Sequence, residues 1–310
     1  MQVFHGLAQA KGLSGAALCL GNFDGVHLGH QALFQTAKRL GVPAALTFEP
    51  HPGKVLSPHL APKLITLLPR KLELIGAYGI SSTLVQPFDQ AYAKTLPRLF
   101  EEALFDRLGV RWAVVGSDFT YGAMRAGTVH TLSTAAQGRG ANVEVVPGVG
   151  VEGVLASSSR IREYILEGRV SAARQLLGRY FDLDGTVVKG QGRGRQLGFP
   201  TANVDTQNEL RPAPGVYAVR VCALPSVKSA WFLGAANIGV KPTFGASEVT
   251  IEVHLFDFDQ DLYGMNLRVE FIDRLRAEQR FASAGELTVQ IRRDIDAARA
   301  ALARAAFTVP

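Results

Sequence analysis

The chain has 310 residues, of which 47% are hydrophobic and 19% are charged, and its formal net charge is +6. This composition is typical of an ordinary globular protein, and the length predicts two domains. No apolar run approaches the ~20 residues of a membrane helix, and no secretory leader is recognisable, so we expect a cytoplasmic protein. The two cysteines, Cys19 and Cys222, lie in apolar runs, which predicts buried thiols rather than a disulfide or a zinc site. The scattered basic residues favour small phosphorylated ligands over nucleic acid.

Strand-like apolar runs alternate with helical patterns over the first 180 residues. The predicted strands lie at 15–21, 43–48, 82–88, 111–116 and 142–149, and the predicted helices at 29–41, 68–79 and 96–109. This alternation predicts an α/β domain with a doubly wound parallel sheet and helices on both faces. In such a sheet, ligands bind beyond the carboxyl ends of the strands.

From residue 181 the pattern changes to short β-rich runs separated by glycine and proline turns. These runs lie at 185–190, 215–224, 229–239, 248–256 and 267–275. They predict a small antiparallel β-barrel or sandwich. A helix is predicted at 171–180, between the halves, and we place the domains at 1–180 and 181–310.

One helix is predicted to close the chain. Ser283 and Glu286 have the spacing of a capping box at its start. The residues of its apolar stripe are Leu287, Ile291, Ile295, Ala298 and Leu302.

The segment GNFDGVHLGH, residues 21–30, follows the first predicted strand and opens the first predicted helix. Free backbone N–H groups and the helix dipole favour an anion there. His27 and His30 lie about one turn apart and can point the same way. A zinc site would need a third ligand, so we interpret the segment as a phosphate cradle with two imidazole donors. Nucleotidyl transfer suits it, because an attacking phosphate needs no general base, only positioning and charge stabilisation at the α-phosphate of a nucleoside triphosphate.

The pattern G-x-F-D-x-x-H-x-G-H is similar to the signature of the HxGH nucleotidyltransferase superfamily. TFEPHP (47–52), VGSDFTYGAMRAGT (115–128) and SSSRIREYILEG (157–168) resemble further motifs of bacterial FAD synthetases. The resemblance implies that His27 and His30 stabilise the triphosphate and that Arg162 neutralises charge on the leaving pyrophosphate. The other implied substrate- or nucleotide-binding residues are Gly21, Asn22, Phe23, Asp24, Gly25, His51, Asp118, Ser158 and Ser159. Two of these depart from the family: Asp118 stands where asparagine is frequent, and Ser159 where threonine is usual.

Residues 182–188, DLDGTVV, are similar to the D-x-D-G-T signature of haloacid-dehalogenase phosphatases. In those enzymes the first aspartate is a nucleophile at the end of a buried strand that begins an α/β fold. Here LLGRYF precedes the segment, and no β–α alternation follows it. We therefore interpret DLDGTVV as a turn that leads into the first strand of the barrel.

Residues 190–204, GQGRGRQLGFPTANV, join a glycine- and arginine-rich loop to a Pro-Thr-Ala-Asn run. Glycine lets a backbone approach an anion closely, and Arg193 and Arg195 can bind phosphate oxygens. Thr201 and Asn203 lie two residues apart, on one face of an extended segment. Their side chains offer the hard oxygen ligands that Mg²⁺ prefers when it binds with a nucleotide.

GFPTAN (198–203), GVYAV (215–219), NIGVKPTFG (237–245), TIEVHLFDFDQDLYG (250–264) and FIDRLRAEQRF (271–281) together resemble the riboflavin kinase family. The resemblance implies that Thr201 and Asn203 bind the metal and that Glu252 is the base acting on the ribityl hydroxyl. The implied substrate- or nucleotide-binding residues are Gly192, Arg193, Arg195, Gly198, Phe199 and Pro200. Lys189 departs from the family, which usually has histidine there.

The whole chain resembles the bacterial bifunctional riboflavin kinase/FMN adenylyltransferase family. The resemblance implies that the C-terminal half phosphorylates riboflavin with ATP to give FMN. The N-terminal half would then adenylylate FMN with a second ATP to give FAD and pyrophosphate. We expect ATP with Mg²⁺, riboflavin and FMN as ligands, and neither nucleic acid nor membrane as a partner.

Two other hypotheses remain at this stage. A non-catalytic flavin-binding protein would consume no ATP and would need no Thr/Asn metal pair. A nucleic-acid-binding module on the basic barrel would need exposed aromatic side chains beside the arginines, where the glycine-rich loop offers only Phe199.

Overall fold

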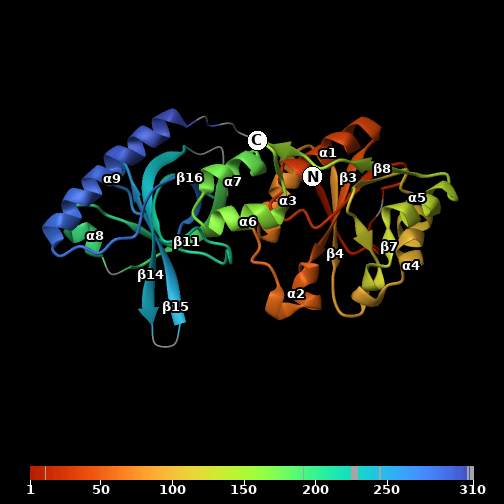
Figure 1. The fold of residues 1–310 in the computed structure, drawn as a ribbon, viewed down its shortest axis with the longest axis horizontal. Coiled ribbons are helices and arrows are strands. Elements are labelled where there is room, and N and C mark those ends of the chain that lie inside the picture. Colours follow the sequence, from red (N-terminus) through yellow and green to blue (C-terminus); the bar gives the residue numbers. More distant parts are fainter. Residues whose placement is uncertain (11, 191, 225–229, 244–245, 306, 308–310) are drawn as a thin grey trace. The chain divides into compact units, whose positions relative to one another are not determined.

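The computed structural model describes residues 1–310 apart from 11, 191, 225–229, 244–245, 306 and 308–310. The chain forms two compact units, residues 1–158 and residues 159–309, coloured red to green and green to blue (Figure 1). The domain boundary predicted at 180/181 stays a prediction. The helices α6 (Ser158–Leu166) and α7 (Val170–Leu177) lie between it and the division of the two units. Helix α7 confirms the helix predicted at 171–180. Within the described residues, no helix combines the length and apolar character needed to cross a membrane.

A parallel sheet of six strands forms the centre of the first unit, in the order β1-β4-β3-β2-β5-β8. Its strands are β1 (Gln2–His5), β2 (Ala17–Leu20), β3 (Pro43–Glu49), β4 (Ser82–Pro87), β5 (Trp112–Gly116) and β8 (Asn142–Val146). From β2 the chain passes to β3 on one side and later returns to β5 on the other. The strand order therefore reverses beside β2, which is where an open α/β sheet binds its ligand.

Helices cover both faces of this sheet. Helices α1 (Leu28–Leu40) and α3 (Leu68–Ala77) share one apolar core with the β2 residues Ala17 and Cys19. Leu18 points to the opposite face and packs in a second core with side chains of three other elements. These elements are α4 (Pro97–Glu101), the π-helical turn η3 (Glu102–Arg107) that continues it, and α5 (Val129–Gln137). The doubly wound fold is thus confirmed, although the helix predicted at 96–109 becomes π-helical after Glu101.

Short elements complete the first unit. They are α2 (Pro52–Leu56), η1 (Pro58–Leu60), η2 (Tyr92–Lys94), β6 (Thr120–Tyr121), η4 (Ala123–Arg125), β7 (Gly127–Thr128), β9 (Gly150–Val151) and β10 (Val154–Leu155).

The second unit contains a closed barrel in the order β11-β12-β15-β14-β13-β16, with neighbouring strands antiparallel. Its strands are β11 (Phe181–Val188), β12 (Ala202–Asp205), β13 (Gly215–Ala223), β14 (Phe232–Thr243), β15 (Ala246–Leu255) and β16 (Asn266–Ala277). The short helix α8 (Arg193–Gln196) lies in the glycine-rich loop. Of the two predicted architectures, the barrel is the one that forms.

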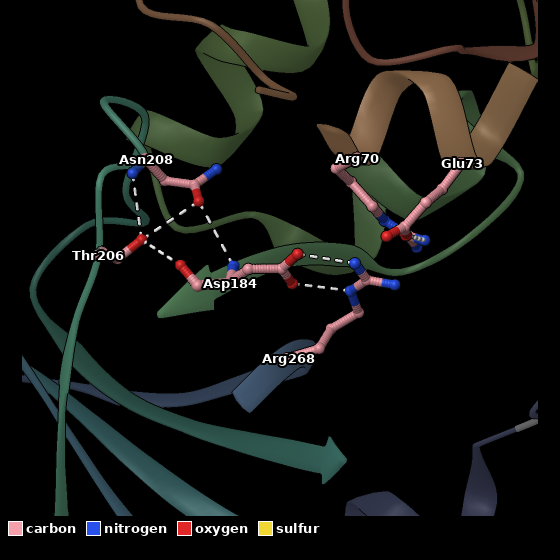
Figure 2. Close-up of polar contacts among 6 residues, drawn as sticks. All are labelled: Arg70, Glu73, Asp184, Thr206, Asn208 and Arg268. Carbon is pink, nitrogen blue, oxygen red and sulfur yellow. Dashed lines mark hydrogen bonds and ion pairs between the residues drawn. The ribbon is translucent and has the colours of Figure 1, made fainter. Parts of the chain in front are cut away.

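The interpretation of DLDGTVV as a turn is wrong, because these residues form most of strand β11. Figure 2 shows the physical reason: the Asp184 carboxylate pairs side-on with the guanidinium of Arg268 on β16, with both N–O distances at 2.7 Å. The Thr206 hydroxyl donates to the Asp184 carbonyl oxygen at 2.6 Å, and the side-chain oxygen of Asn208 accepts from the Asp184 N–H at 3.4 Å. Asp184 therefore joins strands of the barrel.

The final helix, α9 (Ala284–Arg304), packs on β13, β14 and β16. The Ser283 hydroxyl accepts from the Glu286 N–H at 3.2 Å, as the capping-box spacing predicts. The return bond differs, because the Glu286 carboxylate accepts from Ala282 N–H at 3.1 Å rather than from Ser283. Cys19 and Cys222 are both buried, which confirms the expected core thiols.

Candidate functional sites

Three of the predicted motifs meet at the carboxyl edge of the parallel sheet. GNFDGVHLGH follows β2, TFEPHP runs through the end of β3, and Asp118 lies two residues after β5. Because β3, β2 and β5 are neighbours in the sheet, the structure brings these motifs together at one edge of it. This is the edge at which the strand order reverses, so the first candidate site lies where the fold predicts a ligand.

The turn between β2 and α1 has an unusual backbone. Phe23, Gly25 and Val26 all have positive φ, at +50°, +83° and +43°. A Cβ at Gly25 would lie 2.9 Å from the Ile65 side chain, so glycine is required by space as well as by conformation. Phe23 and Val26 are fully buried, and this packing holds a conformation that would otherwise be costly.

Hydrogen bonds of Asp24 hold this turn in place. Its carboxylate is buried and accepts from the backbone N–H groups of Ile65 and Thr66 at 3.0 and 3.1 Å. The Thr66 hydroxyl in turn accepts from the Gly25 N–H at 3.0 Å, and the Ser158 hydroxyl donates to the Asp24 carbonyl oxygen at 2.9 Å. Among the predicted binding residues, Asp24 and Ser158 thus position the turn.

His27 and His30 stack on one another at the start of α1. Their ring centroids are 3.6 Å apart and the planes differ by 23°, as expected for residues one turn apart. The His30 ring also contacts the Phe23 ring in a T-shaped arrangement, with a centroid distance of 5.2 Å. A Cβ on Gly29 would lie 3.1 Å from Cε1 of His27, so the glycine between the histidines leaves room for the His27 ring. His27 is the N-cap residue of α1, which places both rings beside the helix-start amides.

The electrostatics of the turn keep His30 neutral. Burial lowers the pKa of His30 well below its usual value, and the charges of His27 and Lys71 lower it further. The ring therefore acts as a neutral N–H donor near pH 7. Within the described chain, the buried Nδ1 of His30 has no hydrogen-bond partner.

Sequence analysis missed Lys71, which lies on α3 and is 2% exposed. Burial lowers the pKa of Lys71, whereas the carboxylates of Asp24 and Glu49 act in the opposite direction. Its only signal in the sequence is a lysine on the buried side of an amphipathic helix.

The remaining predicted residues of this half differ in their roles. Nδ1 of His51 accepts from Gly53 N–H at 3.1 Å and caps α2, and the Asn22 carbonyl oxygen accepts from the Thr47 hydroxyl at 3.0 Å. Asp118 and Ser159 are exposed. Gly21 packs against Phe23, since a Cβ there would lie 2.9 Å from that ring. Arg162 lies on α6 in the second unit and is assigned to the site by its motif alone.

The second candidate site is a cavity of about 460 Å³ in the barrel unit. A row of residues runs across five strands, each directly opposite the next. In order around the barrel they are Asn203 (β12), Glu252 (β15), Asn237 (β14), Val216 (β13) and Arg276 (β16), and all five line the cavity. The structure therefore brings together Asn203 and Glu252, which sequence analysis had assigned separately, and adds Asn237 between β15 and β13.

The glycine-rich loop forms another side of the cavity. Gly192, Phe199 and Thr201 line it, and Gly190 packs on the Asn203 amide so closely that a Cβ would clash. Arg195, Gly198 and Pro200 are exposed and do not contribute to the cavity lining, although the Pro200 carbonyl oxygen accepts from Nδ1 of His254 at 2.8 Å. Gln191 and the side chain of Arg193 lie outside the described part of the structure.

Helix α9 supplies an apolar wall to the cavity. The lining includes Leu287, Ile291 and Ile295 from the predicted stripe, together with Phe281 from the preceding turn. Ala298 and Leu302, further along the same stripe, are instead buried in the core. The cavity combines oxygen-bearing side chains with an apolar wall. A cavity of this size and lining suits a heteroaromatic molecule with a polar tail.

Comparison with known proteins covers both units. The family described as FAD synthetase matches residues 9–160, and the family described as riboflavin kinase matches residues 177–302. Bifunctional riboflavin kinase/FMN adenylyltransferases of Haemophilus influenzae, Bacillus subtilis and Escherichia coli K12 are 37%, 39% and 38% identical to this chain. They match 97%, 90% and 94% of this chain, and 99%, 90% and 93% of their own lengths.

A solved structure is also similar over the whole chain. It is described as a macrolide-efflux protein from Streptococcus pneumoniae, is 30% identical, and superposes with a TM-score of 0.88. The match covers 96% of this chain and 99% of that one.

Proposed function

Because the chain belongs to the bifunctional riboflavin kinase/FMN adenylyltransferase family, we propose that its two sites divide the two reactions between the two units. The protein phosphorylates riboflavin with ATP to give FMN, and it adenylylates FMN with ATP to give FAD and pyrophosphate. The observation that carries the division is the row Asn203–Glu252–Asn237 in the cavity of the barrel, together with the stacked histidines at the edge of the sheet.

In the barrel, Glu252 acts as the general base. The 5′-hydroxyl of riboflavin attacks the γ-phosphorus of ATP, its proton passes to the Glu252 carboxylate, and ADP leaves. A carboxylate suits this step because a hydroxyl has a proton to lose in the transfer. Asn203 and Asn237 lie on either side of Glu252 across the neighbouring strands and offer amide groups to the ribityl chain or the phosphates.

The oxygen donors beside Glu252 fit Mg²⁺. Thr201 and Asn203 both line the cavity and offer a hydroxyl and an amide oxygen, which are ligands that a hard cation prefers. These two residues would hold the ion, whose remaining ligands would be phosphate oxygens and water. Bound Mg²⁺ supplies positive charge that neutralises the triphosphate.

In the first unit, the phosphate of FMN attacks the α-phosphorus of ATP and pyrophosphate leaves. No proton is abstracted from the nucleophile, so the protein has to hold the two phosphates together and stabilise the charge that develops between them. The neutral N–H donor of His30, the adjacent His27 and the first amides of α1 serve this purpose. We place the enzyme in the cytoplasm, where its substrate ATP is made and used.

Replacement of Arg162 by alanine should slow FAD formation from FMN about tenfold, because a cation that balances charge on the leaving pyrophosphate is lost. FMN formation from riboflavin should not change. The rates of the two half-reactions are measured separately, with FMN or riboflavin as the starting flavin, and Arg160→Ala on the same helix is the control. Equal adenylyl transfer in wild type and Arg162→Ala would remove Arg162 from the site.

The proposal as a whole is tested by incubating the purified protein with riboflavin, ATP and Mg²⁺ and separating the flavins by chromatography. FMN should appear first and FAD should follow, and neither should form when the divalent cation is chelated. FMN alone would overturn the assignment of the histidine site. The absence of any new flavin, with riboflavin still bound, would favour a flavin-binding protein that is not an enzyme.

A further inference from the structure

The charged pair Arg276–Asp294 lines the cavity of the barrel and has no role in the transfer step described above. Nε of Arg276 donates to Oδ1 of Asp294 at 2.9 Å, and Nη2 donates to Oδ2 at 2.8 Å. Nε2 of Gln290, one turn earlier on α9, donates to the same Oδ1 at 2.8 Å. Asp294 is buried, with 10% of its side chain exposed. A buried carboxylate that accepts four hydrogen bonds from two side chains needs an explanation, because desolvation of the charge opposes folding.

The place of this pair on α9 supplies the explanation. On the C-terminal side of Asp294, Ala298 and Leu302 are buried in the core of the unit. On its N-terminal side, Leu287 and Ile291 are only partly buried and face the cavity. Without a ligand, the first three turns of α9 therefore have little apolar packing to hold them. Figure 1 shows these turns beside α8, at the end of the barrel where both elements line the cavity.

Arg276 belongs to the barrel itself. It is the last residue of the row that begins at Asn203 and passes through Glu252, and it lies directly opposite Val216. Its Nη1 also donates to the Ala277 carbonyl oxygen at 2.9 Å, which fixes the guanidinium on β16. The ion pair thus connects the rigid row that carries Glu252 to the part of α9 that is least held by packing.

We propose that the Arg276–Asp294–Gln290 cluster is a positioning element of the kinase, which holds the first three turns of α9 as the apolar wall against which the flavin ring binds. This inference rests on the proposed kinase function of the cavity. The cluster acts through Leu287, Ile291 and Ile295 rather than on the reacting atoms. Its loss should therefore weaken the binding of riboflavin and leave the transfer step intact.

Asp294→Asn keeps the size of the side chain and removes its charge, so the partly buried Arg276 loses its counter-ion. The KM for riboflavin should rise about tenfold, while kcat and the KM for ATP stay within about twofold of wild type. Titration of riboflavin fluorescence without ATP should show the same loss of affinity. A role confined to overall stability would instead lower kcat through a smaller active fraction and leave the KM for riboflavin unchanged.

Asp257→Asn is the matched control. Asp257 forms an ion pair at 2.9 Å with Arg299, which is on α9. Both side chains are exposed, and neither lines the cavity. This variant should keep wild-type constants. Gln290→Met removes the hydrogen bond to Asp294 and leaves the ion pair with Arg276. It should raise the KM for riboflavin about twofold to threefold. This variant tests the proposal if Asp294→Asn does not fold.

FMN formation by the wild type distinguishes a failure of the positioning role from a failure of the kinase function. If wild type makes FMN and neither Asp294→Asn nor Gln290→Met changes the KM for riboflavin, the positioning role is wrong and the kinase assignment stands. An equal rise in the KM for riboflavin in Asp257→Asn would also overturn the positioning role. If wild type makes no FMN, the proposed function itself fails.

Discussion

Glu252→Gln should lower FMN formation from riboflavin about 10³-fold and leave the conversion of FMN to FAD at the wild-type rate. Glutamine keeps the shape and the hydrogen-bonding capacity of the side chain but cannot accept the proton of the ribityl hydroxyl, and loss of a general base costs roughly 10²- to 10⁴-fold. The KM for riboflavin should change little, because the apolar wall of the cavity is untouched. The two rates are measured on one preparation, with riboflavin or FMN as the starting flavin.

The control for Glu252→Gln removes a carboxylate of the same unit that lies outside the cavity. Asp257→Asn serves, since its side chain is 78% exposed and lies just beyond the end of β15. It should keep both activities. A Glu252→Gln enzyme that still phosphorylates riboflavin at more than a tenth of the wild-type rate would contradict the role of Glu252 as base.

His30→Phe should lower FAD formation from FMN by about 10²- to 10³-fold, the loss typical of one preorganised donor to a developing charge. Phenylalanine retains a flat ring that can stack on His27, at a centroid distance of 3.6 Å, and contact the Phe23 ring, at 5.2 Å, so the turn keeps its packing. What it loses is the N–H donor of a ring that burial keeps neutral. Riboflavin phosphorylation should remain at the wild-type rate, since that site belongs to the other unit.

His5→Ala is the control for this variant. His5 is exposed at the end of the edge strand β1, and β4 and β3 separate it from β2. It should retain adenylyl transfer. If His30→Phe were as active as wild type, the adenylyl transfer would not depend on an imidazole donor at this position.

The fold could be predicted from sequence wherever the apolar pattern was continuous. β2, β3 and β5 are short apolar runs, and the structure has them where the pattern predicts. β12 was missed because it has four residues, half-polar, within the motif that drew attention for its chemistry. The edge strand β1 was missed for a similar reason, since neither face of it is fully buried.

In the candidate sites, contacts between residues close in sequence could be predicted, whereas contacts across strands could not. The stacking of His27 and His30 follows from helical spacing, and the common face of Thr201 and Asn203 follows from strand spacing. Cross-strand neighbours cannot be found in this way, because the opposition of Asn203 and Glu252 depends on strand register over 49 positions. In a closed barrel the stagger of the strands is linked to their number and tilt, which the pattern within one segment does not give.

The charged groups show the same limit. Lys71 is a lysine on an amphipathic helix, and the carboxylates of Asp24 and Glu49, which favour its charged form, come from two other segments of the chain. Likewise, Arg276 and Asp294 lie 18 residues apart on a strand and a helix, and their pairing appears only when α9 packs on the barrel. Sequence motifs identify the groups assigned to the reactions and two groups that position the turn, Asp24 and Ser158. Lys71, Arg276 and Asp294 are identified only by the fold.

The central claim is that one chain carries two independent sites, one that depends on Glu252 and one that depends on His30. The most direct measurement mixes equal amounts of Glu252→Gln and His30→Phe with riboflavin, ATP and Mg²⁺ and separates the flavins by chromatography. Glu252→Gln alone should leave riboflavin unchanged, His30→Phe alone should stop at FMN, and the mixture should form FAD, because FMN released by one variant is a substrate for the other. A mixture that accumulates FMN without FAD, or one in which riboflavin is not consumed, would contradict the account.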